Sequence, residues 1–266
     1  MGDFLEVAVA QYPADLDGSQ TRLKWLADGL ARYQGAPLDL IVLPELFQCG
    51  YNIGDRVVEL AEGPDGPFAR SIAELAKAYN TAILYGFAER QDDVLFNSAQ
   101  CIDKAGNVIA RHRKLLLPPG FEGDHFLPGA GSELFQLGKF KVAILVCYDV
   151  EFPETLRHVA LAGADMVVVP TALAQQWGIV SECLVPTRAF ENGVFICYSN
   201  YCGAENGLEY FGGSCIVSPS GGQLARAGTS EHILHARLEY SAVSAARTRL
   251  PYHIDRLKLP WVEGSG

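Results

Sequence analysis

The sequence lacks the features that mark membrane-spanning and secreted chains. No stretch approaches the roughly 18 consecutive apolar residues that a membrane-spanning helix needs, so no membrane association is predicted. The first residues, Met1 to Glu6, contain no basic segment followed by an apolar core, which argues against a signal peptide. We therefore expect a cytoplasmic protein.

Disulfide and metal scaffolds are also missing from the sequence. Its seven cysteines are odd in number and irregularly spaced, and none forms a Cys-x-x-Cys pair. Free thiols of this kind are typical of a reducing compartment rather than of a disulfide framework. No two histidines have the spacing of a zinc finger. We expect neither a structural metal nor a cofactor.

Positive charge is scarce. Lysine and arginine number 21 against 31 aspartates and glutamates, for a formal net charge of −10. The basic cluster Arg111-His112-Arg113-Lys114 stands alone, whereas nucleic-acid-binding proteins gather many cations on one face. A nucleic acid is therefore not an expected partner, and a small molecule is.

Apolar runs and helical spacings alternate along the chain, which has 266 residues of which 49% are apolar. Continuous apolar runs predict strands covered on both faces, and apolar residues three or four apart predict amphipathic helices. We predict strands at residues 6–10, 38–43, 81–87, 141–147, 165–169 and 194–200, helices at 19–33 (with Ser19 as N-cap), 67–79, 153–162 and 182–192, and hairpins within 95–114 and 214–227.

The two halves of the chain resemble each other. Residues 38–44 parallel residues 164–170, and residues 102–108 parallel residues 217–223. Two such halves predict an α/β fold in which two sheets pack face to face with helices outside, a four-layer αββα sandwich. The alternative is an eight-stranded α/β barrel, but the hairpins interrupt its strict alternation.

The expected domain organisation is simple. The length is compatible with one compact domain or with two fused halves, and a single domain is predicted over residues 1–266 because one sandwich uses the whole chain. From about Leu234 the pattern weakens, and residues 234–266 are predicted to form a polar, proline-punctuated tail that wraps a surface or a partner subunit.

Three residues that can act together chemically stand at predicted strand ends. Cys147 ends an apolar run just before a helix that begins near Pro153, and Glu45 and Lys114 end two other strands. Ligand sites of open α/β sheets form at carboxyl ends of strands, and helix N-termini offer free N–H groups to a developing negative charge. The alternative interpretation is a free core cysteine beside two solvated charges.

The motifs around these residues resemble those of the nitrilase superfamily of carbon–nitrogen hydrolases. The resemblance covers nearly the whole chain and is most specific in the block Cys147-Tyr148-Asp149-x-x-Phe152-Pro153-Glu154. It also includes Pro44-Glu45-Leu46, Gly50-Tyr51-Asn52, Tyr85-Gly86-Phe87-x-Glu89, Phe96-Asn97-Ser98, Arg113-Lys114, Phe126-x-Pro128-Gly129, Pro170-Thr171-Ala172 and Arg188-Ala189-x-Glu191-Asn192. That family has the αββα sandwich and usually pairs into dimers, so the resemblance implies a homodimer or a higher homo-oligomer.

The resemblance also implies catalytic roles. Cys147 corresponds to the nucleophile, and Glu45 to the base that takes the thiol proton and later activates water. Lys114 would stabilise the tetrahedral oxyanion together with the backbone N–H of Tyr148. Such a scheme needs no histidine, because a neighbouring ammonium group favours the thiolate.

A second glutamate, Glu122, resembles the family's further active-site glutamate, which orients the substrate and the lysine. The loop before it reads Leu115-Leu116 where relatives often have His-Leu, and Asp124 is the alternative. The substrate-binding residues are expected to include Tyr51, Tyr148, Glu151, Thr171, Ala172 and Trp177.

The expected reaction is hydrolysis of small aliphatic carboxamides to carboxylate and ammonia through a cysteine thioester. Tyr148-Asp149 follows the cysteine where nitrilases proper tend to have Trp-Glu, and the chain looks most like aliphatic and ω-amino-amide amidases such as 5-aminovaleramide amidase. The acidic side chains of Glu151, Glu205 and Glu209 would suit a substrate with a distal ammonium group, and the alternative is that they cap helices and keep the protein soluble.

Other functions remain open at this point. An N-carbamoyl amino acid hydrolase or a nitrile hydrolase would use the same residues. A papain-like hydrolase would instead pair Cys147 with a histidine, for which His112, His125 and His158 are candidates. A catalytically silent binding protein of the same fold is expected to have lost one of the three key residues, and none is missing.

Overall fold

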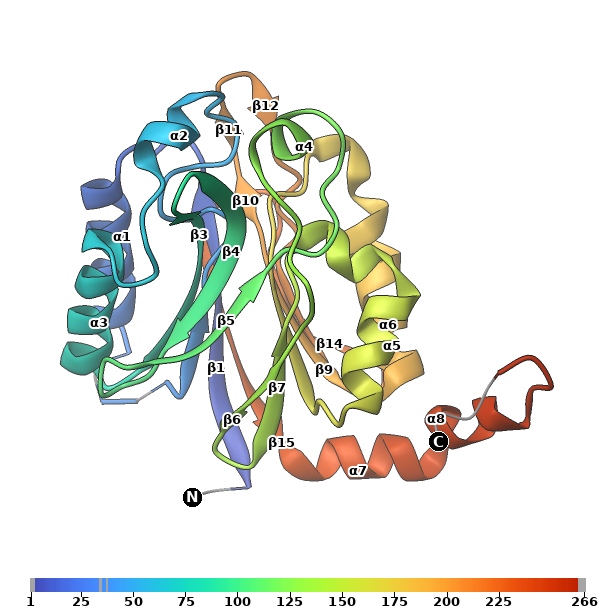
Figure 1. Cartoon of the computed structure of the whole chain (residues 1–266). Coiled ribbons are helices and arrows are strands. Elements are labelled where there is room, and N and C mark those ends of the chain that lie inside the picture. The colour runs from blue at the N-terminus through green and yellow to red at the C-terminus, as the bar shows by residue number, and fades with distance from the viewer. Residues whose placement is uncertain (1–2, 34, 37, 263–266) are drawn as a thin grey trace.

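Two β-sheets lie face to face between two layers of helices (Figure 1). The structure is a computed structural model that describes residues 3–33, 35–36 and 38–262. In the first sheet the strand order is β10-β1-β2-β3-β4-β5, and β15 pairs with β1. These strands are β1 (Phe4–Pro13), β2 (Leu40–Val42), β3 (Ala82–Gln91), β4 (Val94–Ile102), β5 (Val108–Arg113), β10 (Tyr201–Cys202) and β15 (His232–Glu239).

The second sheet has the strand order β14-β13-β9-β8-β7-β6. Its strands are β6 (Leu134–Leu137), β7 (Phe140–Ile144), β8 (Met166–Pro170), β9 (Phe195–Ser199), β13 (Cys215–Val217) and β14 (Gln223–Arg226). The helices are α1 (Ser19–Ala31), α2 (Arg56–Leu60), α3 (Pro67–Tyr79), α4 (Phe121–His125), α5 (Pro153–Leu161), α6 (Val185–Asn192), α7 (Tyr240–Arg249) and α8 (Tyr252–Asp255), and a small hairpin joins β11 (Ala204–Glu205) to β12 (Leu208–Glu209).

Three apolar clusters hold the four layers together. The cluster between the sheets joins side chains of both, such as Val7 and Val9 of β1 with Val168 of β8. Side chains on the outer face of β1, Ala8 and Ala10, pack instead in a second cluster with α1 and α3, and the third cluster joins the second sheet to α5 and α6. Because both faces are covered at the centre of each sheet, the central strands, such as β2 and β8, are continuous apolar runs. The predicted αββα sandwich is confirmed, and the barrel is not formed.

The expected irregular tail from Leu234 is wrong for most of its length. Residues 232–239 form β15, which pairs antiparallel with β1 in a register that runs from Phe4↔Glu239 to Gln11↔His232, and α7 follows. Leu234 and Leu238 are buried, whereas His235 and Arg237 between them are exposed and polar, and this alternation weakened the apolar signal. Residues 263–266 of the predicted tail lie outside the described residues.

Two predicted boundaries also shift. The strand expected to reach Cys147 ends at Ile144, because the N–H of Val146 bonds to Asp149 Oδ2 (3.1 Å) instead of to a strand, and a 3₁₀ turn spans Cys147–Glu151. Ser19 is already helical, and Gly18, with φ of 88°, is the N-cap instead, since a glycine turns the chain there without steric conflict.

Parallel strands place the chemically active residues at one edge of the sandwich. Glu45 follows β2 in the first sheet, and Cys147 and Thr171 follow the adjacent parallel strands β7 and β8 in the second. The N–H of Glu45 bonds to the carbonyl of Thr171 (3.4 Å), which joins the two sheets at this edge. In the described part of the chain, no helix is long and apolar enough to cross a membrane.

Candidate active site

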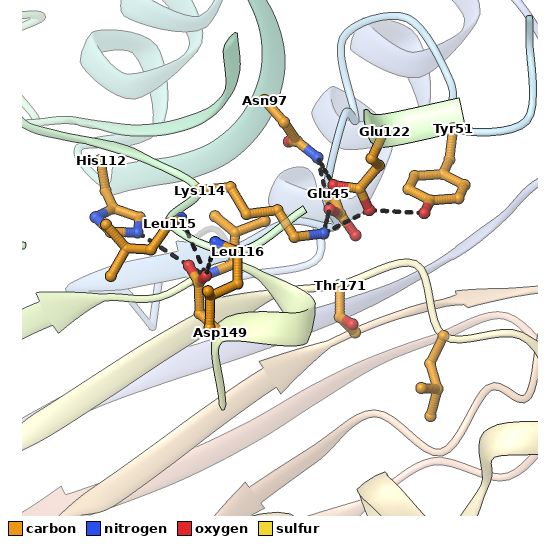
Figure 2. A network of polar contacts seen from close by, with 12 residues as sticks. Glu45, Tyr51, Asn97, His112, Lys114, Leu115, Leu116, Glu122, Asp149 and Thr171 are labelled. Atoms are coloured by element: carbon orange, nitrogen blue, oxygen red, sulfur yellow. Dashed lines mark hydrogen bonds and ion pairs between the residues drawn. The ribbon is translucent and has the colours of Figure 1, made fainter. Parts of the chain in front are cut away.

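Lys114 lies between two buried carboxylates. Its Nζ is 2.7 Å from Oε1 of Glu45 and 2.6 Å from Oε1 of Glu122, and all three side chains are at most 1% exposed (Figure 2). Glu45 comes from the loop after β2, Lys114 from the end of β5, and Glu122 from α4. The structure thus brings together the two glutamates and the lysine that the sequence singled out.

Two further side chains complete this cluster. Asn97 of β4 donates its amide Nδ2 to Glu45 Oε1 (2.7 Å) and to Glu122 Oε2 (3.1 Å). The hydroxyl of Tyr51 donates to Glu122 Oε1 (2.7 Å). Sequence reasoning expected Tyr51 near the substrate but gave Asn97 no role, although its segment Phe96-Asn97-Ser98 belonged to the family resemblance.

Cys147 occupies a strained turn. Its φ is 44°, in the left-handed region that non-glycine residues rarely adopt, and it begins the 3₁₀ turn Cys147–Glu151. Strain of this kind persists only when surrounding contacts hold it in place, and it is common at functional sites. Cys147 as a whole residue is half-buried, whereas its neighbours Val146 and Asp149 are buried.

The electrostatic environment keeps the thiol of Cys147 protonated. Burial raises its pKa well above the ordinary value, and the Glu45 carboxylate pushes the pKa in the same direction. Lys114 and a hydrogen bond to the Thr171 side chain lower the pKa but do not outweigh these effects. A nucleophilic thiolate therefore has to be generated by a base.

Glu45 has the proton affinity of such a base. Burial raises its pKa to about 7, against the lowering effects of Lys114 and of the hydrogen bond from Asn97, while Glu122 adds to the rise. A carboxyl group with this pKa exchanges protons near neutral pH in either direction. Burial alone would lower the pKa of Lys114, but the two carboxylates raise it above its usual value, so the lysine stays positively charged.

Asp149 ties the lysine and the cysteine segments together. Its Oδ1 accepts the backbone N–H groups of Leu115 and Leu116 (3.0 Å each), and its Oδ2 accepts that of Val146 (3.1 Å). His112 Nε2 lies 3.1 Å from the same Oδ2 (Figure 2). Asp149 is fully buried, so a single carboxylate fixes the segment after Lys114 relative to the turn of Cys147.

The histidines proposed for a papain-like scheme have other partners or lie elsewhere. His112 pairs with Asp149, and His125 lies 2.8 Å from the carbonyl of Phe121 and 3.0 Å from Asp55. His158 is an exposed residue of α5. Within residues 3–33, 35–36 and 38–262, no histidine forms a hydrogen bond with Cys147, and no group of His, Cys, Asp and Glu side chains could hold a metal ion.

The remaining substrate-binding candidates lie at different depths. Thr171 and Ala172 are buried just after β8, whereas Trp177 is 57% exposed. Tyr148 is half-buried, with its ring edge-on to Phe152 at 4.9 Å between centroids, and Glu151 is half-buried with a pKa raised by burial. Their roles stay predictions.

Glu205 does not fit the role of a free carboxylate for a substrate ammonium group. Its Oε2 accepts the backbone N–H groups of Tyr51 (3.0 Å) and Asn52 (2.6 Å) and the hydroxyl of Tyr210 (2.9 Å). Its Oε1 lies 3.8 Å from the buried guanidinium of Arg22. Glu205 therefore anchors the loop that carries Tyr51. Glu209 is exposed in β12, and Asp124 is exposed in α4.

Comparisons with known proteins find relatives that span nearly the whole chain. Residues 6–248 match the family described as carbon–nitrogen hydrolase. A Pseudomonas protegens protein described as a hydrolase in the pqqF 5′ region is 40% identical over 249 residues, which cover 92% of this chain and 85% of that protein.

Solved structures of an amidase from Nesterenkonia sp. AN1 have the same fold. A variant with the acetamide moiety of fluoroacetamide added covalently at its active-site cysteine superposes with a TM-score of 0.85, at 30% identity and 97% coverage of both chains. A variant in complex with butyramide superposes with a TM-score of 0.80, at 30% identity, covering 93% of this chain and 95% of that chain.

Proposed function

Because this chain belongs to the carbon–nitrogen hydrolase family, and is thus a hydrolase of carbon–nitrogen bonds other than peptide bonds, we propose that it is an amidase for small aliphatic carboxamides. The observation that carries the proposal is the buried cluster of Glu45, Lys114 and Glu122 beside the turn of Cys147. The products are a carboxylate and ammonia.

In the first step the cysteine is acylated. Glu45 takes the thiol proton of Cys147, and the sulfur attacks the carbonyl carbon of the amide. The carbonyl oxygen becomes negatively charged and is stabilised by the ammonium group of Lys114 and the backbone N–H of Tyr148. Lys114 suits this role because its raised pKa keeps the charge in place at neutral pH.

In the next steps the amide nitrogen leaves and water enters. The tetrahedral adduct collapses, the C–N bond breaks, and the nitrogen takes the proton from Glu45, so ammonia departs and a thioester remains on Cys147. Glu45, again a carboxylate, takes a proton from water as the oxygen attacks the thioester carbon. The C–S bond then breaks, the thiol regains its proton, and the carboxylic acid product ionises.

The position of Glu122 supports a role in orienting Lys114. Glu122 Oε1 accepts hydrogen bonds from Lys114 Nζ (2.6 Å) and from the Tyr51 hydroxyl (2.7 Å), so its carboxylate holds the ammonium group in one place. A lysine held by two carboxylates does not rotate freely, and an oxyanion site fixed in this way needs no reorganisation during the reaction.

Short acyl groups are the favoured substrates. The related Nesterenkonia amidase binds butyramide and carries an acetamide group on its active-site cysteine, which supports a compact acyl site in this chain as well. We propose that its size is limited by Thr171, which is buried and contacts Cys147, and by the next residue, the buried Ala172.

A substrate panel tests the proposal. Ammonia release is followed with butyramide, 5-aminovaleramide, glutaramate, an N-carbamoyl amino acid and an aliphatic nitrile. We expect turnover of the amides alone. Turnover of the carbamoyl compound or the nitrile, with every amide inert, would contradict amide specificity and assign the substrate to another branch of the family.

We also propose that the chain works as a homodimer or a higher homo-oligomer in the cytoplasm. Large apolar side chains are exposed along the C-terminal segment 250–262, among them Ile254 (56%), Leu257 (49%) and Trp261 (75%). Clustered apolar side chains of this kind mark an association surface. All seven cysteines are free, which supports a reducing compartment.

A further inference from the structure

Asn97 is in contact with all three charged residues of the cluster. Its backbone carbonyl accepts the N–H of Lys114 (2.8 Å), and its side-chain Nδ2 donates to Glu45 Oε1 (2.7 Å) and to Glu122 Oε2 (3.1 Å). It is completely buried near the start of β4. One side chain therefore fixes the distance between the two carboxylates.

The two oxygens of Glu45 are in different environments. Oε1 accepts hydrogen bonds from both Asn97 Nδ2 and Lys114 Nζ, each at 2.7 Å, and the two donors approach Glu45 from different sides (Figure 2). Oε2 is buried and has no hydrogen-bond partner among the residues that the structure describes. Only Oε2 is therefore free to exchange a proton with the thiol, the leaving nitrogen or water.

We propose that Asn97 is a positioning residue that, by holding Oε1 of Glu45, presents Oε2 as the oxygen that takes and returns the proton. The inference rests on the proposed amidase function and adds to it a role for Asn97 and the identity of the oxygen of Glu45 that carries the proton. Asn97 acts through Glu45 and does not touch the reacting atoms.

A packing role alone does not explain an asparagine at this position. The side-chain oxygen Oδ1 of Asn97 is buried and has no hydrogen-bond partner in the described part of the chain, which is unfavourable in a protein interior. A leucine has nearly the same shape and would leave no polar atom unpaired. What leucine lacks is the Nδ2 donor, and that donor is the group in contact with both glutamates.

The donor also favours the charged form of Glu45. The hydrogen bond from Asn97 opposes the burial that raises the pKa of Glu45 to about 7. Without this bond the pKa rises further. A base works only when it is deprotonated, so activity is lost as the pH falls through this pKa, and a higher pKa moves the acidic limb of the pH–rate profile to higher pH.

The test compares Asn97→Leu with Gln100→Met by measuring kcat and KM for butyramide from pH 5 to 9. Gln100 is a buried amide of the same strand on the opposite face, where it donates to Pro64 and Tyr85, so the control removes comparable bonds away from the site. For Asn97→Leu we expect kcat to fall about ten- to hundredfold at pH 7, with KM little changed and the acidic limb at higher pH. Gln100→Met is expected to keep the wild-type limb.

Two results would overturn the inference. One is a folded Asn97→Leu variant that keeps the wild-type kcat and the wild-type acidic limb of the pH–rate profile. The other is a Gln100→Met variant in which that acidic limb shifts as far as it does in Asn97→Leu. Thermal unfolding and circular dichroism establish folding. If Asn97→Leu does not fold, the smaller Asn97→Ser, which cannot reach either glutamate directly, takes its place with the same expectations.

A second measurement keeps the inference separate from the substrate assignment. Iodoacetamide alkylates thiolates, so its rate with Cys147, followed by peptide mass spectrometry, reports proton removal without any amide turnover. Cys183 is exposed and serves as an internal reference. If the wild type hydrolyses none of the amides, the substrate assignment fails. The inference about Asn97 is then decided by the pH dependence of the alkylation rate. We expect Asn97→Leu to move the acidic limb of this profile to higher pH for Cys147 and to leave it unchanged for Cys183. An unchanged profile for Cys147 would overturn the inference.

Discussion

Burial determines what Glu45 can do. An exposed glutamate is ionised at pH 7 and is a weak base, whereas this one is fully buried beside a lysine and a second glutamate. Burial is the larger effect and raises the pKa of Glu45 to about 7, although Lys114 lowers it. The same carboxyl group is thereby suited to take a proton from a thiol and to return it to a departing amine.

The pH dependence of the wild type follows from this pKa. Because Glu45 must be deprotonated to act as a base, kcat/KM for butyramide should decline about tenfold per unit below about pH 7. Glu45→Gln should be inactive across the range. A rate that stays constant down to pH 5 would contradict the assignment of Glu45 as the base.

Asp149 is the residue whose loss should affect both stability and activity. In Asp149→Asn one of the two oxygens becomes an NH₂ group that faces backbone N–H donors, so buried donors of Leu115 and Leu116 or of Val146 lose their acceptor. We expect the free energy of unfolding, measured by urea denaturation, to fall by about 2 kcal/mol, and kcat to fall as well.

Asp165→Asn provides the matched control for this change. Asp165 is also buried and accepts the N–H of Lys141 (3.0 Å) and a bond from Arg247 (3.2 Å), away from the site. The Asp165→Asn variant should have a lower free energy of unfolding than the wild type and an unchanged kcat. An Asp149→Asn variant with unchanged kcat would show that Asp149 does not position the site.

The sequence predicted the residues at strand ends but not those inside strands. Glu45 follows an apolar run and Lys114 ends a basic cluster at a predicted strand end, and charges at such points are visible in the sequence. Asn97 lies within β4, and although Phe96-Asn97-Ser98 belongs to the family resemblance, nothing in this segment indicates which side chains Asn97 contacts. Its role depends on which side chains the fold places opposite it, and this is not a local property of the sequence.

At the scale of the elements, Gly86 allows β3 to approach the Glu45 loop. A Cβ atom at Gly86 would lie 2.3 Å from the backbone nitrogen of Leu46 and 2.7 Å from Cα of Glu45. The backbone N–H of Gly86 bonds to the carbonyl of Pro44 (3.1 Å), so the contact is part of the sheet edge that carries the site.

Gly86→Ala should therefore displace Glu45. We expect the free energy of unfolding to drop by about 1–3 kcal/mol and kcat for butyramide to fall by more than tenfold, since the added methyl group meets backbone atoms that cannot rotate away. Gly131→Ala is the control, because a Cβ there meets nothing within 4 Å. Equal activity of the two variants would contradict the requirement for close approach.

Strands buried on both faces were easier to predict than strands buried on one. β8, with the sequence Met166–Pro170, is apolar throughout and was found within a residue or two. β15 alternates buried leucines with exposed His235 and Arg237, and its place depends on a long-range pairing with β1. Strand pairing across more than 200 residues is fixed by the completed sheet and not by the segment itself.

At the scale of the whole molecule, the exposed apolar side chains of the C-terminal segment 250–262 predict that copies of this chain associate with one another. Replacing Leu257 and Trp261 together by serine removes two of the largest exposed apolar side chains and should convert a dimer into monomers, as measured by gel filtration with light scattering. Leu224→Ser, at an equally exposed leucine of β14, is the control and should leave the dimer intact. A wild type that is monomeric at micromolar concentration would contradict the dimer.

Cys147 is the proposed nucleophile of an amidase, and every step of the mechanism depends on its thiol. Ammonia release from butyramide by the wild type, Cys147→Ala and Cys183→Ala, all folded by circular dichroism, tests this assignment most directly. Cys183 is an exposed thiol with no partner in the cluster, so its removal should leave the rate unchanged. We expect Cys147→Ala to release no ammonia above background. Turnover by Cys147→Ala at a rate near that of the wild type would contradict the mechanism.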